Sequence, residues 1–140
     1  MGDGLLDTNH FVHALARDAL SLECRTFLDR LKQGLTRAYL DPLVVHELPY
    51  SLPRVHQQMS RSDVATYILG VLAWPGIVGE THLLREAIDR WDQTPGLGFV
   101  DAYLAARARQ ESVPVYTKNV RELSMQGAVV PDPLPGSSAT

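Results

Sequence analysis

Short apolar runs alternate with helix-patterned segments along this chain, and that alternation constrains the fold more than any other feature. The runs that we predict to be strands span residues 4–6, 37–40, 76–79 and 113–117. Apolar residues at helical spacing predict helices over residues 8–17, 21–32, 41 onward, 62–74, 81–91 and 99–110. Strands separated by helices are typical of βαβ units. The sequence therefore predicts an α/β fold with a small, mostly parallel sheet flanked by helices.

The third predicted helix carries conflicting signals. Asp41 and Pro42 form a favourable start, because an aspartate can cap a helix and a proline suits its first turn. Pro49 and Pro53, however, lack the N–H groups that a helix interior requires. We therefore expect this helix to kink or break near Leu48.

Length and composition favour one soluble domain. The chain has 140 residues, and we expect residues 1–130 to form the domain and residues 131–140, with their three prolines, to be a flexible tail. A formal net charge of -3 excludes a strongly basic nucleic-acid coat, although a local basic patch could still bind a phosphate chain. Cys24 is the single cysteine, which excludes an internal disulfide and fits a reducing, cytoplasmic location. No secretion signal is apparent, and the longest apolar stretch, residues 67–74, is too short to span a bilayer, so we expect no membrane partner.

Three acidic residues occupy positions where a surface charge is not expected. Asp7 directly follows the first predicted strand, at the edge where ligands bind in α/β sheets. Glu47 follows apolar residues one helical turn earlier, and Asp101 shares the apolar side of its helix, so we expect all three to point inward. Unpaired buried carboxylates are costly and need partners. Taken singly, each could be an ion pair, a helix cap or a surface group, whereas together they could bind a divalent cation such as Mg²⁺ or Mn²⁺.

Two other chemistries lack a required residue. A phosphatase of the haloacid dehalogenase type needs a second aspartate two residues after the first, where this chain has Asn9. A zinc protease built on His46 and Glu47 needs a second histidine at residue 50, which is Tyr50.

Four ordered segments resemble the motifs of PIN-domain proteins. They extend over roughly residues 4 to 123 and comprise Leu5–Asn9, the isolated acid Glu47 in a mid-chain helix, Gly98–Ala106 and Val115–Val120. The resemblance implies an α/β/α sandwich and a metal-dependent endoribonuclease. Within the family, this short chain is most similar to the VapC toxins of prokaryotic toxin–antitoxin pairs.

The resemblance also implies roles for individual residues. The implied ligands of Mg²⁺ or Mn²⁺ are Asp7, Glu47 and Asp101. The residues that would shape the site are Thr8 and Asn9 behind Asp7, and Thr117 near the fourth motif.

The fourth motif departs from the family pattern at Asn119, where many relatives carry an aspartate. An amide oxygen can contact a metal or a water but adds no negative charge, so a second metal site is weakened. Glu122 is close enough in sequence to substitute. The alternative is a degenerate PIN scaffold that binds RNA or a partner protein without cutting it, although the three retained acids favour the nuclease.

The partners implied by the resemblance are an RNA substrate and a VapB-type antitoxin that blocks the cleft. Candidates for steering RNA phosphates are Lys118, Arg121, Arg107 and Arg109, although basic residues of this kind are more often ordinary surface charges. Such toxins commonly dimerise, so the resemblance also implies a homodimer. One possible surface is the apolar side of residues 64–74, although residues at that spacing are more often core.

Overall fold

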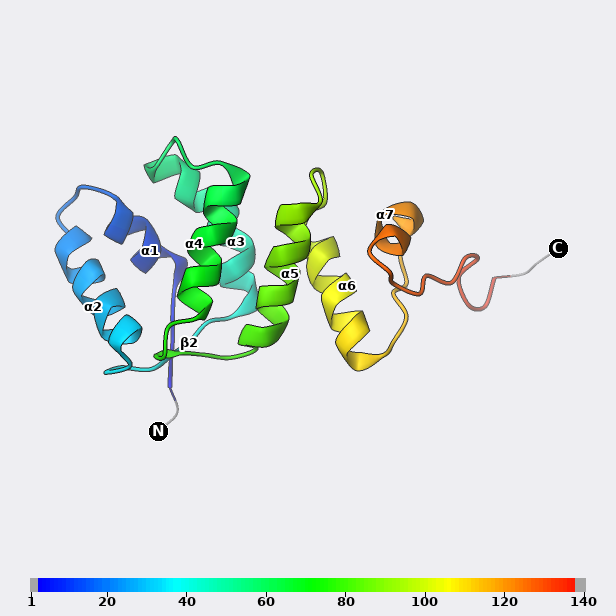
Figure 1. Cartoon of the computed structure of the whole chain (residues 1–140), viewed down its shortest axis with the longest axis horizontal. Helices are drawn as coiled ribbons and strands as arrows, with labels where there is room; N and C mark the ends of the chain where they lie inside the picture. The colour runs from blue at the N-terminus through cyan, green and yellow to red at the C-terminus, as the bar shows by residue number, and fades with distance from the viewer. Residues whose placement is uncertain (1–2, 138–140) are drawn as a thin grey trace. The chain divides into compact units, whose positions relative to one another are not determined.

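The computed structural model of the protein describes residues 3–137. Within these residues the chain forms three strands and seven helices, which Figure 1 shows in order along the chain. Their bounds are β1 Gly4–Leu5, α1 Thr8–Leu15, α2 Ser21–Gln33, β2 Ala38–Tyr39, α3 Pro42–Val55, α4 Arg61–Leu72, β3 Ile77–Val78, α5 Thr81–Gln93, α6 Phe99–Glu111 and α7 Val120–Met125. The chain divides into two compact units, Met1–Arg85 and Glu86–Thr140.

The three strands form one parallel sheet in the order β1-β2-β3, so the predicted α/β fold with a small parallel sheet is confirmed. Gly4 pairs with Ala38, and Ala38 pairs in turn with Ile77. The first strand was expected to be buried, yet Leu5 is 81% exposed, while the next residue, Leu6, is buried. The reason is that β1 is an edge strand of this sheet, and successive side chains on a strand point to opposite faces.

Gly76 sets the approach of β3 to the end of α2. Its N–H donates to the carbonyl of Leu31 at 2.8 Å, and its own carbonyl accepts from Ala38 N at 2.9 Å. A Cβ atom at this position would lie 2.3 Å from the carbonyl oxygen of Thr36, closer than atoms can pack. Only a glycine therefore lets the chain enter β3 beside β2.

The predicted strand over residues 113–117 is wrong. This segment is extended, but its backbone hydrogen bonds to other segments join only Val113 N to Ala108 O at 3.0 Å and Val115 N to Val129 O at 2.9 Å, and no ladder forms among the described residues. A β-branched run favours an extended backbone, but only a neighbouring strand in register makes it part of a sheet. Helix α7 was not predicted from the sequence. Only one of its six residues, Leu123, is buried, so it has no apolar face to recognise.

Helix α3 does not break at its prolines. It runs without interruption from Pro42 to Val55, with Asp41 accepting a capping hydrogen bond from Leu43 N at 2.8 Å. Of the expected kink or break near Leu48, the break is therefore wrong. Its buried side chains, Val45, Leu48 and Leu52, pack one helical face into the core, which offsets the hydrogen bonds lost at the prolines.

The helices of the unit Met1–Arg85 pack against one another. Helix α1 packs against α2 and α3, and α3 packs against α4 (Figure 1). The apolar side of α4 was suggested as a surface for a homodimer, but it belongs to the core. Its buried residues are Val64, Ala65, Ile68, Val71 and Leu72. We therefore assign no dimer surface to this helix.

In the unit Glu86–Thr140, α7 packs against α6. The core of this contact is Leu123, which is 0% exposed and clusters with Ala105, Ala108 and Val115. Residues 131–137 of the predicted tail contain neither helix nor strand, and residues 138–140 lie outside the described residues. Between residues 3 and 137 no helix is both long and apolar enough to cross a membrane.

Candidate functional site

Asp7 lies at the carboxyl end of β1, where the strand passes into α1. The parallel pairing continues to Leu6, whose N–H donates to Tyr39 O at 3.0 Å, so the strand end is fixed one residue before the acid. Asp7 occupies the N-cap position of α1, but its carboxylate makes no capping hydrogen bond. Its described side-chain contact is a long hydrogen bond from Asn9 Nδ2, at 3.5 Å. The reading of Asp7 as a helix cap therefore does not account for its carboxylate.

Glu47 is held next to this strand end by the residue that follows Asp7. The Thr8 hydroxyl donates to Glu47 Oε2 at 2.8 Å. Thr8 is 3% exposed, so a buried hydroxyl fixes the orientation of an acid on α3. Both Asp7 and Glu47 follow neighbouring parallel strands, β1 and β2, whose carboxyl ends lie at the same edge of the sheet. The expected role of Thr8 in shaping the site behind Asp7 stays a prediction, and the structure adds its contact with Glu47.

Asp101 and Asn119 form a second pair, in the unit Glu86–Thr140. Asp101 lies in the first turn of α6, and Asn119 precedes α7. The Asn119 amide donates through Nδ2 to Asp101 Oδ2 at 2.9 Å. Thr117 holds the backbone of Asn119, because its Oγ1 accepts a hydrogen bond from Asn119 N at 2.9 Å. The amide thus makes a favourable hydrogen bond where a second carboxylate would repel the first.

The three predicted acids share one arrangement. In each of them a single carboxylate oxygen accepts a hydrogen bond from a neighbouring polar side chain: Asn9 for Asp7, Thr8 for Glu47 and Asn119 for Asp101. The other oxygen has no hydrogen bond among the described residues. Carboxylate oxygens of this kind suit a hard divalent cation such as Mg²⁺ or Mn²⁺. Within either unit, however, the described residues contain no group of three His, Cys, Asp or Glu side chains that could hold a metal ion.

The expectation that all three carboxylates point inward is wrong in part. Asp7 and Glu47 are exposed, and Asp101 is half-buried. Their helical neighbours are apolar, as the sequence indicated, but the acids sit at the rim of the packed face, where water reaches them. Water-accessible carboxylates avoid the desolvation cost of buried ones and can still bind a ligand from solution.

The basic residues proposed for RNA divide into two groups. Arg107 donates from Nε to Glu111 Oε2 at 3.1 Å, and Arg109 pairs with Glu86, so neither positive charge is unopposed. The hydrogen bond to Glu111, with a further bond to Tyr103, raises the pKa of Arg107. Lys118 and Arg121 are exposed and form no ion pair among residues 3–137.

These two residues, Lys118 and Arg121, lie on either side of Asn119 in the chain. Among the described residues they, rather than the arginines of α6, are therefore the unpaired cations close in sequence to the Asp101–Asn119 pair. Glu122 is exposed in the first turn of α7, and its contribution to the site stays a prediction.

Comparison with known proteins gives one family. The family model described as PIN domain matches residues 4–124 of the chain. The match includes both hydrogen-bonded pairs, Thr8–Glu47 and Asp101–Asn119. Neither the curated proteins nor the solved structures gave a match.

Proposed function

Because the chain belongs to the PIN domain family, whose members are generally metal-dependent nucleases, we propose that it is a Mg²⁺- or Mn²⁺-dependent endoribonuclease. The proposed metal ligands are Asp7, Glu47 and Asp101, with Asn119 at the fourth position of the site. More narrowly, we propose that the chain is a cytoplasmic toxin of the VapC type, with RNA as its substrate and a VapB-type antitoxin as its protein partner.

The observation that carries the proposal is the shared arrangement of the three acids. A neighbouring hydroxyl or amide orients each carboxylate through one oxygen and leaves the other oxygen available. A polar contact that only neutralised a surface charge would use Lys or Arg. Orientation by uncharged donors preserves the negative charge that a divalent cation requires.

The chain's own residues would have three tasks in the reaction. Asp7, Glu47 and Asp101 would hold the cation, which supplies a Lewis acid for water activation and for the charge that develops on the phosphodiester. Thr8 and Asn119 would fix the orientation of their acids. Lys118 and Arg121 would bind RNA phosphates next to Asn119.

The direct test is the cleavage of total cellular RNA by the purified, antitoxin-free chain, with new 5′ ends mapped in Mg²⁺ or Mn²⁺. Attack by water predicts products with 5′-phosphate and 3′-hydroxyl ends, and these should vanish with EDTA and with Asp7→Asn. The matched control is Asp41→Asn, which also changes an acid that follows a parallel strand into an amide. Asp41 caps α3 through an acceptor oxygen that asparagine retains, so this variant should cut normally.

A second function, a scaffold that binds RNA or a partner without cutting, is favoured by one observation. The Asn119 amide already satisfies the Asp101 oxygen that a fourth acid would leave open to a second cation. Under this alternative, a folded chain binds RNA equally well with and without Mn²⁺, and Asp7→Asn leaves that binding unchanged. Cyclic phosphate ends or no cleavage from a folded chain would count against the proposed nuclease.

A further inference from the structure

Helix α7 cannot hold its own position. It has six residues, and isolated helices of that length are not stable in water. Its first neighbour is Asn119, which donates to Asp101, so any movement of α7 is transmitted to that hydrogen bond. Besides the buried Leu123, a residue of α5 contacts the C-cap of α7.

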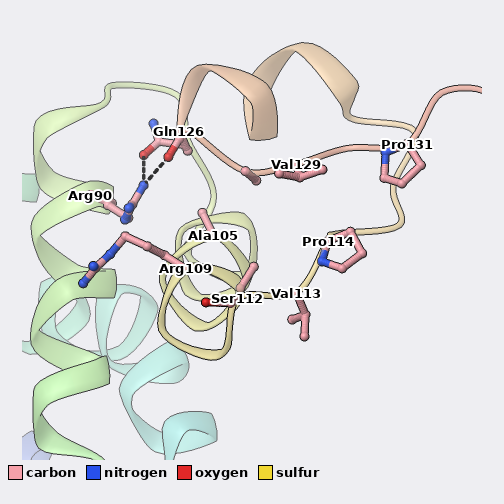
Figure 2. A pocket seen from close by; sticks show the side chains of 12 residues that line it. Arg90, Ala105, Arg109, Ser112, Val113, Pro114, Gln126, Val129 and Pro131 are labelled. Atoms are coloured by element: carbon pink, nitrogen blue, oxygen red, sulfur yellow. Dashed lines mark hydrogen bonds between the residues drawn. The ribbon is translucent and has the colours of Figure 1, made fainter.

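That contact is made by Arg90. Its Nη1 donates to the backbone carbonyl of Gln126 at 2.6 Å and lies 3.3 Å from the Gln126 side-chain oxygen. Figure 2 shows the guanidinium reaching from α5 to both oxygens at the end of α7. Gln126 is the residue that ends α7, and a cation suits the negative end of a helix. Its side chain also donates to Thr94 Oγ1 at 3.0 Å, which ties the same point to the end of α5.

Glu86 holds Arg90 in place for this contact. Arg90 Nη2 lies 3.4 Å from Glu86 Oε1, and the side chains of both residues are 19% exposed. Arg109 and Gln110 on α6 donate to the same carboxylate, so Glu86 joins α5, α6 and the guanidinium. Arg90 Nε is buried without a hydrogen-bond partner among the described residues.

We propose that Arg90 is a positioning residue for Asp101. By holding Gln126 at one end of α7, it fixes Asn119 at the other end, and Asn119 in turn orients the Asp101 carboxylate. The consequence for metal binding rests on the proposed function, whereas the consequence for Asn119 does not.

The test compares Arg90→Met with Arg107→Met in the full chain, free of metal and RNA. Arg107 is the matched control, because it is an arginine of the same unit with an i,i+4 acidic partner but no contact with α7. NMR hydrogen exchange follows the backbone amides of residues 123–128 and the side-chain amide of Asn119. In Arg90→Met we expect exchange at these sites to accelerate about tenfold, with the α6 amides unchanged, because a hydrogen bond to a charged donor is lost. Arg90→Lys, which keeps the charge and one donor, should restore part of the protection.

Equal exchange of α7 and Asn119 in Arg90→Met and Arg107→Met would overturn the proposal. If Arg90→Met also loses protection in α6, Gln126→Ala decides, because it removes one acceptor of Arg90 and the bond to Thr94 but keeps the carbonyl contact. Faster exchange of the Asn119 amide in that variant supports the positioning role, and unchanged exchange rejects it. Mn²⁺ affinity, measured in the same variants, should fall about tenfold with Arg90→Met. A wild-type chain that neither binds Mn²⁺ nor cuts RNA would reject the nuclease but leave the exchange result valid.

Discussion

Thr8 and Glu47, separated by 39 positions in the chain, are joined by a hydrogen bond of 2.8 Å from the threonine hydroxyl to the carboxylate. The donor is buried and the acceptor is exposed, so the rigid side of the pair is the one that follows β1. The hydrogen bond thereby fixes the Glu47 carboxylate relative to the end of β1, which Asp7 directly follows. This one bond explains how an acid in the second turn of a proline-containing helix can be aimed reproducibly.

Replacement of Thr8 by valine should release Glu47. Valine keeps the buried volume but removes the donor, so we expect Mn²⁺ affinity and RNA cleavage to fall between about 10-fold and 100-fold. The free energy of unfolding should fall by about 1 kcal/mol, as for loss of one hydrogen bond. Thr8→Ser keeps the hydroxyl and should retain affinity. Titration with Mn²⁺ alongside cleavage assays checks this, and normal metal affinity in Thr8→Val would contradict it.

Replacement of Asn119 by aspartate should exchange a hydrogen bond for a like-charge contact. At pH 7 without metal, two carboxylates would face each other where the amide now donates at 2.9 Å, so we expect the free energy of unfolding to fall by about 1 kcal/mol. Added Mn²⁺ should stabilise this variant more than the wild type, because the cation neutralises both acids. Thermal melts with and without Mn²⁺ measure the difference. Equal stabilisation of the two proteins would show that residue 119 does not face the metal.

The stability of the chain should depend on pH through Glu86. Desolvation by burial acts to raise the pKa of Glu86, but hydrogen bonds from Arg109 and Gln110 and the charges of Arg109 and Arg90 outweigh it and lower the pKa. A lowered pKa in the folded state means that the stabilisation is present above the unfolded value, about 4.3, and is lost as pH falls through the folded value.

We therefore expect Glu86→Gln to be less stable than the wild type at pH 7, by about 2 kcal/mol, with the gap closing in acid. Urea unfolding at pH 7, 4 and 3 follows the gap. A difference that stayed constant over this range would mean that the Glu86 charge does not stabilise the fold.

RNA binding should depend on Lys118 more than on Arg107. Lys118 has no ion pair among the described residues, whereas Arg107 is already paired with Glu111. Each phosphate contact with single-stranded RNA contributes about 0.7 to the slope of log affinity against log salt. Lys118→Gln should therefore lower that slope by about 0.7 and Arg107→Gln should leave it unchanged, as measured with a catalytically inactive Asp7→Asn background. The reverse order would place the RNA along α6.

Helix α3 should become more stable when one of its prolines is removed. Pro49→Ala restores an N–H for the helix interior, and we expect a gain of about 1–2 kcal/mol after the extra entropy of the unfolded chain is deducted. Denaturant unfolding measures the gain. If Pro49→Ala instead destabilises the chain, the ring itself contributes packing that no other residue supplies.

The sequence predicted the elements that local rules control. Residues 37–40 and 76–79 are short runs with clear ends, and Asp41 with Pro42 marks a helix start, so β2, β3 and α3 each begin within one residue of the expected position. The strand over residues 113–117 was predicted in error because the pairing of a strand is a tertiary property that its own residues do not specify. The break in α3 was predicted in error because packing of Leu48 and Leu52 outweighs the local cost of proline.

The acids of the candidate site could be predicted from the sequence, but the residues that contact and orient them could not. Asp7 and Asp101 follow recognisable local features, a strand end and a helix start. The hydrogen bond from Thr8 to Glu47 joins two helices, and the spacing of these residues along the chain does not predict it. For Arg90 the sequence contains one weak indication, an acid four residues earlier on an amphipathic helix. Such i,i+4 pairs are too common in surface helices to identify a functional residue.

A ribosome that makes this chain completes Asp7, Glu47 and the whole unit Met1–Arg85 before it adds Asp101 and Asn119. Domains generally fold in the order of their synthesis, so the first pair of side chains forms while the second does not yet exist. A nascent or prematurely terminated product that stops before residue 101 therefore lacks one of the three proposed ligands. Under the proposed nuclease function, this order means that no chain shorter than 101 residues carries all three proposed ligands.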